Sequence, residues 1–192
     1  MAYRKKLSVI IPSLSPDERL PMLVKELKTH GFEHIIVVND GSSTEYDAIF
    51  TQVRQMGAVV LRHMVNQGKG RALKTAFHYI LEHLDCCVGA VTIDSDGQHA
   101  VKDIIRCCEK LLETPDCLVM GCRNFKQENV PFKSSFGNIL TSKVMQLLVG
   151  IKISDTQTGL RAMSLEHIRK FLSVSGERFE YETNVVRKRI LP

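Results

Sequence analysis

The chain has 192 residues, of which 44% are hydrophobic and 24% are charged, and its formal net charge is +5. This length suits one domain with a real core, and this composition excludes a disordered or fibrous chain. No apolar run approaches the about 20 residues that a membrane span needs, and the run near the N-terminus is too short for a signal peptide. We therefore expect one cytoplasmic domain over residues 1–192.

The positive charge is concentrated in the last third of the chain. Residues 121–192 contain 12 Lys and Arg against 6 Asp and Glu, a balance of +6, whereas residues 1–120 contain 14 against 15. The excess favours a phosphate-bearing or membrane-surface partner, with a solvated basic face as the alternative. A nucleic-acid partner is not expected, because no basic run alternates with aromatic residues. The six cysteines form no Cys-x-x-Cys pair and indicate buried, reduced thiols.

Strands and helices are predicted to alternate along the first two thirds of the chain. Short apolar runs predict strands at residues 7–11, 34–38, 58–61, 88–93 and 117–121. Helical spacing of apolar side chains predicts a helix after each of the first four strands. For the first helix, Ser15 is the expected N-cap, Pro16 the first helical position and Gly31 the end. This alternation predicts an α/β class with a doubly wound, mostly parallel sheet flanked by helices.

The remaining third has a different pattern. Apolar residues between 136 and 151 recur at helical spacing, which indicates either core packing or an apolar wall facing a lipid. Residues 150–159 form a polar connection, and residues 179–186 are predicted to be helical.

Polar residues gather where the predicted strands end. The segments are Asn39-Asp40-Gly41-Ser42, Asp94-Ser95-Asp96 and Gly121-Cys122-Arg123. In doubly wound sheets, ligands bind beyond the carboxyl ends of the strands, so these segments are expected to meet at one site. Two carboxylates one residue apart repel each other unless a cation lies between them, which favours a divalent cation at Asp94 and Asp96.

Other nucleotide-binding motifs are absent from the sequence. Gly68-Lys69-Gly70 is not a Walker loop, because Gly70 stands where Ser or Thr is required. No Gly-x-Gly-x-x-Gly follows the first strand, which argues against a Rossmann dinucleotide site. Sugar-nucleotide pyrophosphorylases have a similar layout, but residues 12–15 here replace their Gly-rich loop. Spacing indicates neither a Ser/His/Asp set nor a histidine metal cluster.

Six motifs, in this order, resemble those of family 2 glycosyltransferases, which have the GT-A fold of nucleotide-diphospho-sugar transferases. They are Val9-Ile10-Ile11-Pro12, Val37-Val38-Asn39-Asp40-Gly41-Ser42, Asn66-Gln67-Gly68-Lys69-Gly70, Asp94-Ser95-Asp96-Gly97-Gln98-His99, Gly121-Cys122-Arg123 and Asp155-Thr156-Gln157-Thr158-Gly159-Leu160-Arg161. Residues 98–99, 154–161 and 179–182 are most similar to the branch of dolichol-phosphate mannose synthase and bacterial polyprenyl-phosphate glycosyltransferases. Asn39 stands where that family usually has Asp, and Ser13-Leu14-Ser15-Pro16 replaces its usual Ala-Tyr-Asn-Glu.

The resemblance implies an inverting, metal-dependent transfer of a sugar to a polyprenyl phosphate. The donor would be a nucleotide-diphosphate sugar of the UDP-glucose or GDP-mannose type. The resemblance places the reaction at the cytoplasmic face of a membrane, in cell envelope biogenesis. In several bacterial relatives a GtrA-like membrane domain follows the catalytic domain, so we expect this chain to be truncated at its C-terminus.

The resemblance also assigns roles to individual residues. The metal ligands for Mg²⁺ or Mn²⁺ would be Asp94, Asp96 and Gln98, with a loop-capping amide as the alternative for Gln98. The catalytic residues would be Asp155, Asp96, Arg123 and Arg161, where the two guanidinium groups suit phosphate. The other substrate-binding residues would be Pro12, Ser13, Asp40, Gly41, Lys69, Asp94, Ser95 and Gln157. Asp155 would be a general base for a hydroxyl acceptor, or would orient an arginine for a phosphate acceptor.

Two other functions are compatible with these residues. One is a glycosyltransferase that acts on a sugar hydroxyl in a surface polysaccharide. The other is a non-catalytic sugar-nucleotide binding domain, although the intact metal and phosphate motifs argue against it.

Overall fold

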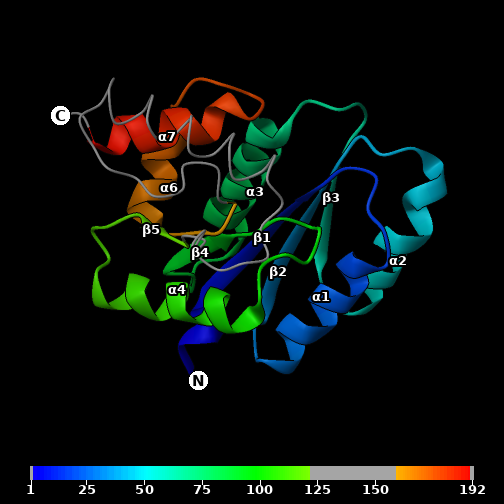
Figure 1. Ribbon diagram of the computed structural model, residues 1–192, viewed down its shortest axis with the longest axis horizontal. Coiled ribbons are helices and arrows are strands. Elements are labelled where there is room, and N and C mark those ends of the chain that lie inside the picture. The colour runs from blue at the N-terminus through cyan, green and yellow to red at the C-terminus, as the bar shows by residue number, and fades with distance from the viewer. Residues whose placement is uncertain (1, 122–158, 191–192) are drawn as a thin grey trace, which may run out of the picture.

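The computed structural model describes residues 2–121 and 159–190. Within these residues, a six-stranded sheet with the order β3-β2-β1-β4-β6-β5 has helices on both faces (Figure 1). The first four strands are parallel, whereas β6 runs antiparallel to β4 and β5. The predicted α/β class with a mostly parallel, helix-flanked sheet is therefore confirmed.

The elements follow the predicted alternation. The strands are β1 Leu7–Ser13, β2 His34–Asp40, β3 Val59–His63, β4 Gly89–Thr92, β5 Val119–Met120 and β6 Arg161–Ser164. The helices are α1 Arg19–Thr29, α2 Asp47–Gln55, α3 Lys69–His83, α4 Val101–Glu113, α6 Leu165–Leu172 and α7 Glu180–Ile190, with short 3-10 turns at Ala2–Lys6 and Thr44–Tyr46. The sequence pattern predicts neither β6 nor α6, because a four-residue strand is too short to show alternation. The predicted helix over residues 136–151 lies outside the described residues.

The two faces of the sheet carry two separate cores because side chains alternate along each strand. In β1, Leu7, Val9 and Ile11 belong to the core beneath α1, α2 and α4. Ile10 points to the other face and packs with side chains of α3, α6 and α7. Both faces of the parallel strands are thus buried, which explains why these strands read as continuous apolar runs.

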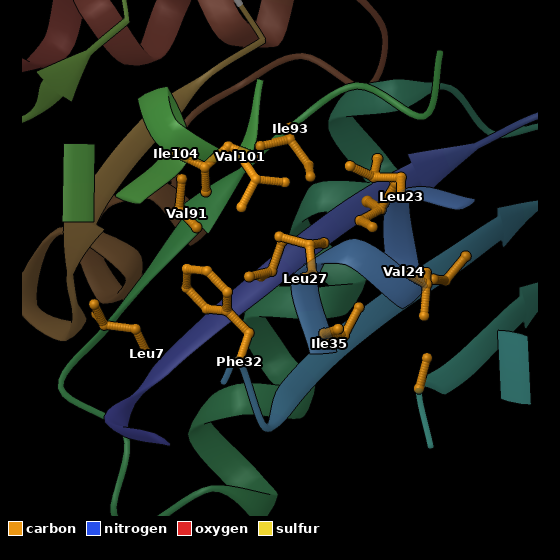
Figure 2. Close-up of a cluster of buried hydrophobic side chains, with 14 of the residues drawn as sticks. Leu7, Leu23, Val24, Leu27, Phe32, Ile35, Val91, Ile93, Val101 and Ile104 are labelled. Carbon is orange, nitrogen blue, oxygen red and sulfur yellow. The ribbon is translucent and has the colours of Figure 1, made fainter. Parts of the chain in front are cut away.

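Figure 2 shows the first of these cores. Phe32, at the turn into β2, is fully buried and lies beside Leu7 and Leu27. Val101 and Ile104 of α4 approach Val91 and Ile93 from the same side of the sheet. Burial of each such side chain contributes about 1.5–3 kcal/mol to folding.

The first helix begins later than predicted. Ser15 is not its N-cap, because Asp17 Oδ1 accepts the Arg19 N–H at 3.0 Å and the helix starts at Arg19. Ser15 has a positive φ of 50°, and its N–H donates to Ser42 Oγ at 2.9 Å. The predicted end at Gly31 is confirmed, since the N–H groups of Gly31 and Phe32 donate back into the last turn.

The thiols agree only in part with the sequence prediction. Cys87, Cys107 and Cys108 are buried, whereas Cys86 and Cys117 are exposed. Among the described residues, no helix is both long and apolar enough to cross a membrane.

The topology defines where a ligand would bind. β2 and β4 pair with opposite edges of β1, so the connections that leave β1 and β4 diverge to different parts of the sheet. The crevice at the carboxyl ends of β1 and β4 is the topological switch point at which such sheets bind ligands.

Candidate active site

A cavity of about 740 Å³ lies at this switch point. Three segments that are distant in sequence line it: the end of β1, the residues after β4, and the start of α7 with the residues before it. The end of β2 and the residues at the start of α3 also line it. The lining residues are Pro12, Ser13, Leu14, Asp40, Asn66, Gly68, Lys69, Asp94, Ser95, Asp96, Arg178, Phe179, Glu180, Glu182 and Thr183. A volume of this size suits a small ligand such as a nucleotide.

Asp94 lies at the centre of this site. Lys69 Nζ is 2.7 Å from Asp94 Oδ1, and His99 Nε2 is 3.2 Å from Oδ2. Burial alone would raise the pKa of Asp94, but the His99 hydrogen bond and the Lys69 ammonium outweigh it and hold the pKa well below its usual range. Asp94 is therefore a carboxylate at any physiological pH.

Gly159, on the segment that leads into β6, lies directly behind Asp94. A Cβ atom at Gly159 would come within 2.2 Å of Asp94 Oδ2, so only glycine leaves room for the carboxylate. Thr92 Oγ1 donates to the Gly159 carbonyl at 2.9 Å and ties this segment to β4.

Asp96 and Gln98 form the outer part of the acidic loop. The Gln98 N–H donates to Asp96 Oδ1 at 3.0 Å, and its amide nitrogen lies 2.6 Å from Asp96 Oδ2. Of the three predicted metal-binding residues, Asp94 and Asp96 both line the cavity, whereas Gln98 contacts Asp96 and is not among the described lining residues.

The donor set fits Mg²⁺ or Mn²⁺ in one particular way. Within the described part of the chain, no group of three or more His, Cys, Asp and Glu side chains could hold a metal by itself. Mg²⁺, however, is commonly bound by one or two carboxylates together with substrate phosphates and water. Asp94 and Asp96 supply two carboxylates inside a cavity large enough for such a substrate.

Asp40 organises the wall of the cavity. Its Oδ1 accepts the Gln67 N–H at 2.9 Å and its Oδ2 accepts the Gly68 N–H at 2.8 Å, while His63 Nδ1 lies 2.7 Å from Oδ1. The β3–α3 loop is therefore fixed by a carboxylate at the end of β2. Sequence reasoning named Asp40 as a substrate ligand and missed its contacts with this loop and with His63.

Gly41 lets this loop come close to the end of β2. Its φ is +79°, and a Cβ atom there would lie 2.3 Å from the Asn66 nitrogen. The predicted substrate-binding residues Pro12 and Ser13 lie opposite, at the end of β1. Ser13 Oγ is buried and has no hydrogen-bond partner among the described residues, so it is a polar group still to be satisfied by a ligand or water.

Glu182 is a site residue that the sequence prediction did not include. Its Oε2 lies 2.9 Å from Lys69 Nζ, and its carbonyl oxygen accepts Arg161 Nη1 at 2.7 Å. The only sequence signal for it was its place in the family-like segment at residues 179–182. Arg161 is 3% exposed and is not among the described residues that line the cavity, so it lies behind the wall rather than in it.

Three other predicted site residues, Arg123, Asp155 and Gln157, lie outside the described residues. The structure therefore brings together the donor-side predictions, namely Pro12, Ser13, Asp40, Lys69, Asp94, Ser95 and Asp96. Of the residues assigned to the acceptor, only Arg161 lies among the described residues, and it is buried against Glu182.

The family model described as "Glycosyl transferase family 2" matches residues 8–172. The chain belongs to glycosyltransferase family 2. This membership confirms the family and the enzyme class that the six motifs indicated.

Individual relatives of this glycosyltransferase act on polyprenyl phosphates according to their names. A UDP-N-acetylglucosamine–dolichyl-phosphate N-acetylglucosaminyltransferase of Methanococcus voltae is 30% identical over 196 residues, which cover 93% of this chain and 77% of that protein. An undecaprenyl-phosphate 4-deoxy-4-formamido-L-arabinose transferase of Serratia proteamaculans is 28% identical and covers 88% of this chain, but only 52% of that protein.

Solved structures agree on the fold. Glucosyl-3-phosphoglycerate synthase of Mycobacterium tuberculosis, crystallised with Mn²⁺, UDP and phosphoglyceric acid, superimposes with a TM-score of 0.69 at 18% identity. The match covers 95% of this chain and 64% of that chain. The expected GT-A architecture is thereby confirmed.

Proposed function

We propose that this glycosyltransferase transfers a sugar from a nucleotide-diphosphate donor to a polyprenyl phosphate at the cytoplasmic face of a membrane, with inversion at the anomeric carbon. The observation that carries the proposal is the acidic pair Asp94 and Asp96 in a cavity at the switch point, beside Lys69. The names of the relatives from M. voltae and S. proteamaculans support the acceptor class.

The donor side of the site suits a nucleotide diphosphate. A Mg²⁺ or Mn²⁺ ion held by Asp94, Asp96 and Gln98 would neutralise the charge that develops on the leaving diphosphate. The Lys69 ammonium adds a second positive charge at the same place, held between Asp94 and Glu182. The cation held by the carboxylates and the Lys69 ammonium would together orient the diphosphate.

The nucleoside would lie against the ends of β1 and β2. Pro12, Ser13, Asp40 and Gly41 lie on this side, and the unpartnered Ser13 hydroxyl is available to a base or ribose. Asp40 contributes mainly by holding the loop at residues 64–68 in place, because three of its hydrogen bonds are already made. This side of the cavity would decide between UDP and GDP donors.

The acceptor would approach from the side of Arg123, Asp155, Gln157 and Arg161. A polyprenyl phosphate is already an anionic nucleophile near neutral pH and needs little general-base help. Arg123 would bind its phosphate and Asp155 would orient an arginine, whereas the buried Arg161 would support the wall from behind through Glu182. If the acceptor is instead a sugar hydroxyl, Asp155 must take its proton.

A labelled-donor assay tests the proposal. Purified protein is incubated with radiolabelled UDP-N-acetylglucosamine, UDP-glucose or GDP-mannose, with Mn²⁺ and with undecaprenyl or dolichyl phosphate in detergent. Label that moves into the organic phase only when the lipid phosphate is present is the expected result. Label that enters only a water-soluble oligosaccharide acceptor would support the hydroxyl alternative and overturn the lipid proposal.

Two variants, one in the site and one on the surface, test whether the transfer depends on the acidic pair. Asp96→Asn should abolish transfer, since it removes one of the two proposed metal carboxylates. Asp103→Asn changes an exposed carboxylate that pairs with Arg106 on α4, and it should retain full transfer. Donor binding without transfer to any acceptor would favour a non-catalytic binding domain.

A further inference from the structure

A row of four charged side chains of alternating sign crosses the wall of the site. Asp94 follows β4, Lys69 begins α3, Glu182 lies on α7 and Arg161 begins β6. Lys69 Nζ lies 2.7 Å from Asp94 Oδ1 and 2.9 Å from Glu182 Oε2. Arg161 Nη2 lies 3.7 Å from Glu182 Oε1. One ammonium group is thus shared between a proposed metal ligand and a carboxylate with no assigned role.

The shared ammonium is largely shielded from water. The side chains of Lys69 and Glu182 are 16% and 9% exposed. A lysine ammonium is charged near neutral pH, and the carboxylates of Asp94 and Glu182 flank this one on two sides. Lys69 therefore stays charged, and its charge has to be balanced at all times.

This arrangement creates a competition at Asp94. A divalent cation and the Lys69 ammonium both need the Asp94 carboxylate, and two positive charges on the same oxygen repel each other. Without a second acceptor, Lys69 would either exclude the cation or leave the site. Glu182 supplies that acceptor through Oε2, while its Oε1 faces Arg161.

We propose that Glu182 is a positioning residue that retains Lys69 when a divalent cation takes the Asp94 carboxylate. The ammonium then stays beside the cavity, where it faces the donor diphosphate. Glu182 therefore sets how strongly Lys69 competes with the cation. This inference rests on the proposed metal-dependent function.

A purely structural role for Glu182 would be to hold α7 on α3, but other contacts already do this. Glu177 pairs with Arg71 at 2.7 Å and with Lys74 at 3.0 Å, and its carbonyl oxygen accepts the Arg71 N–H at 2.9 Å. Tyr181 is fully buried, and its hydroxyl donates to the Phe171 carbonyl at 2.9 Å. Glu177 does not line the cavity described here, so it provides a matched control for Glu182.

The test measures binding of Mn²⁺ alone, without nucleotide. The electron paramagnetic resonance signal of free aqueous Mn²⁺ is titrated against the native protein, Lys69→Met, Glu182→Gln, the double variant and Glu177→Gln. Lys69→Met should bind Mn²⁺ about tenfold more tightly, because the competing charge is gone. Glu182→Gln should bind it about threefold to tenfold more weakly, because Lys69 then depends on Asp94 alone.

The double variant decides whether Glu182 acts through Lys69. It should bind Mn²⁺ as tightly as Lys69→Met, and Glu177→Gln should match the native protein. Equal weakening by Glu182→Gln with and without Lys69 would overturn the inference, as would an unchanged affinity in Glu182→Gln. Both results leave the proposed function intact, whereas absence of Mn²⁺ binding in every variant would overturn the proposed cation site as well.

Discussion

His63 Nδ1 lies 2.7 Å from Asp40 Oδ1, and this buried pair joins the ends of β2 and β3 at the edge of the active site. A carboxylate only accepts hydrogen bonds, so the proton lies on Nδ1. His63 Nε2 is in turn 2.9 Å from the Thr75 hydroxyl of α3. The chain of contacts links two strands, the loop between β3 and α3, and the helix that presents Lys69.

Asp40→Asn should loosen this loop. An asparagine has only one acceptor oxygen. Its amide nitrogen would face an N–H group that donates to the Asp40 carboxylate in the native protein. The free energy of unfolding should fall by about 2–3 kcal/mol, measured by urea denaturation, because a buried donor is left unsatisfied. Asp47→Asn, which removes an exposed pair with Arg62, should cost less than about 1 kcal/mol. Equal losses in the two variants would contradict the proposed importance of the Asp40 contacts.

Gly159→Ala should disrupt the acidic pair although it replaces neither carboxylate. The new methyl group would lie 2.2 Å from Asp94 Oδ2 and force the carboxylate away from Lys69 and His99. Mn²⁺ and nucleotide-sugar affinity should therefore fall by at least about tenfold in calorimetric titrations. Gly31→Ala is the control, because it adds the same methyl group at a position with no other atom within 4 Å, although there it strains a positive φ of 84°. It should lower stability by about 1 kcal/mol and leave binding unchanged.

The low pKa of Asp94 predicts a loss of stability in acid. The folded-state pKa lies below the ordinary value of 3.8, so the carboxylate stabilises the fold at pH values above 3.8. That contribution is lost as the pH falls through the folded-state pKa. The difference in unfolding free energy between the native protein and Asp94→Asn should thus be the same at about pH 5 and about pH 7. The difference should shrink below about pH 4. A difference that grows in acid would contradict the lowered pKa of Asp94.

The cysteines should differ sharply in reactivity. Burial raises the pKa of Cys108 to about 12, so its reactive thiolate is scarce in the folded protein near neutral pH. Iodoacetamide at neutral pH should label Cys86 and Cys117, which are exposed, and spare Cys87, Cys107 and Cys108. Peptide mass spectrometry before and after denaturation checks this, and rapid labelling of Cys108 in the native protein would contradict the described packing.

Much of the donor half of the site could be predicted from sequence because its residues follow strands. A run such as residues 88–93 predicts a strand, and parallel strands bring their carboxyl ends together, so Asp40 and Asp94 had to share one edge. The fold class followed from the same pattern and the family from the resemblance of the six motifs, and both are confirmed.

The contacts that cross between distant elements could not be predicted. Nothing local marks Glu182 as a partner of Lys69, because their pairing depends on how α7 lies on α3. The sequence also placed Ser15 at a helix start, where Asp17 provides the acceptor instead. In both cases tertiary packing, not local propensity, chose the partner.

The placement of the cavity wall has a consequence for biosynthesis. The ends of β1 and β4 leave the ribosome well before the residues at the start of α7 that close the same cavity. Domains fold largely as units during synthesis, and the parallel strands β1 to β4 can pair before α7 exists. A nascent chain at that stage would carry the acidic pair with Lys69 balanced by Asp94 alone. The cavity wall is therefore completed late in synthesis, when the start of α7 and Glu182 dock against Lys69.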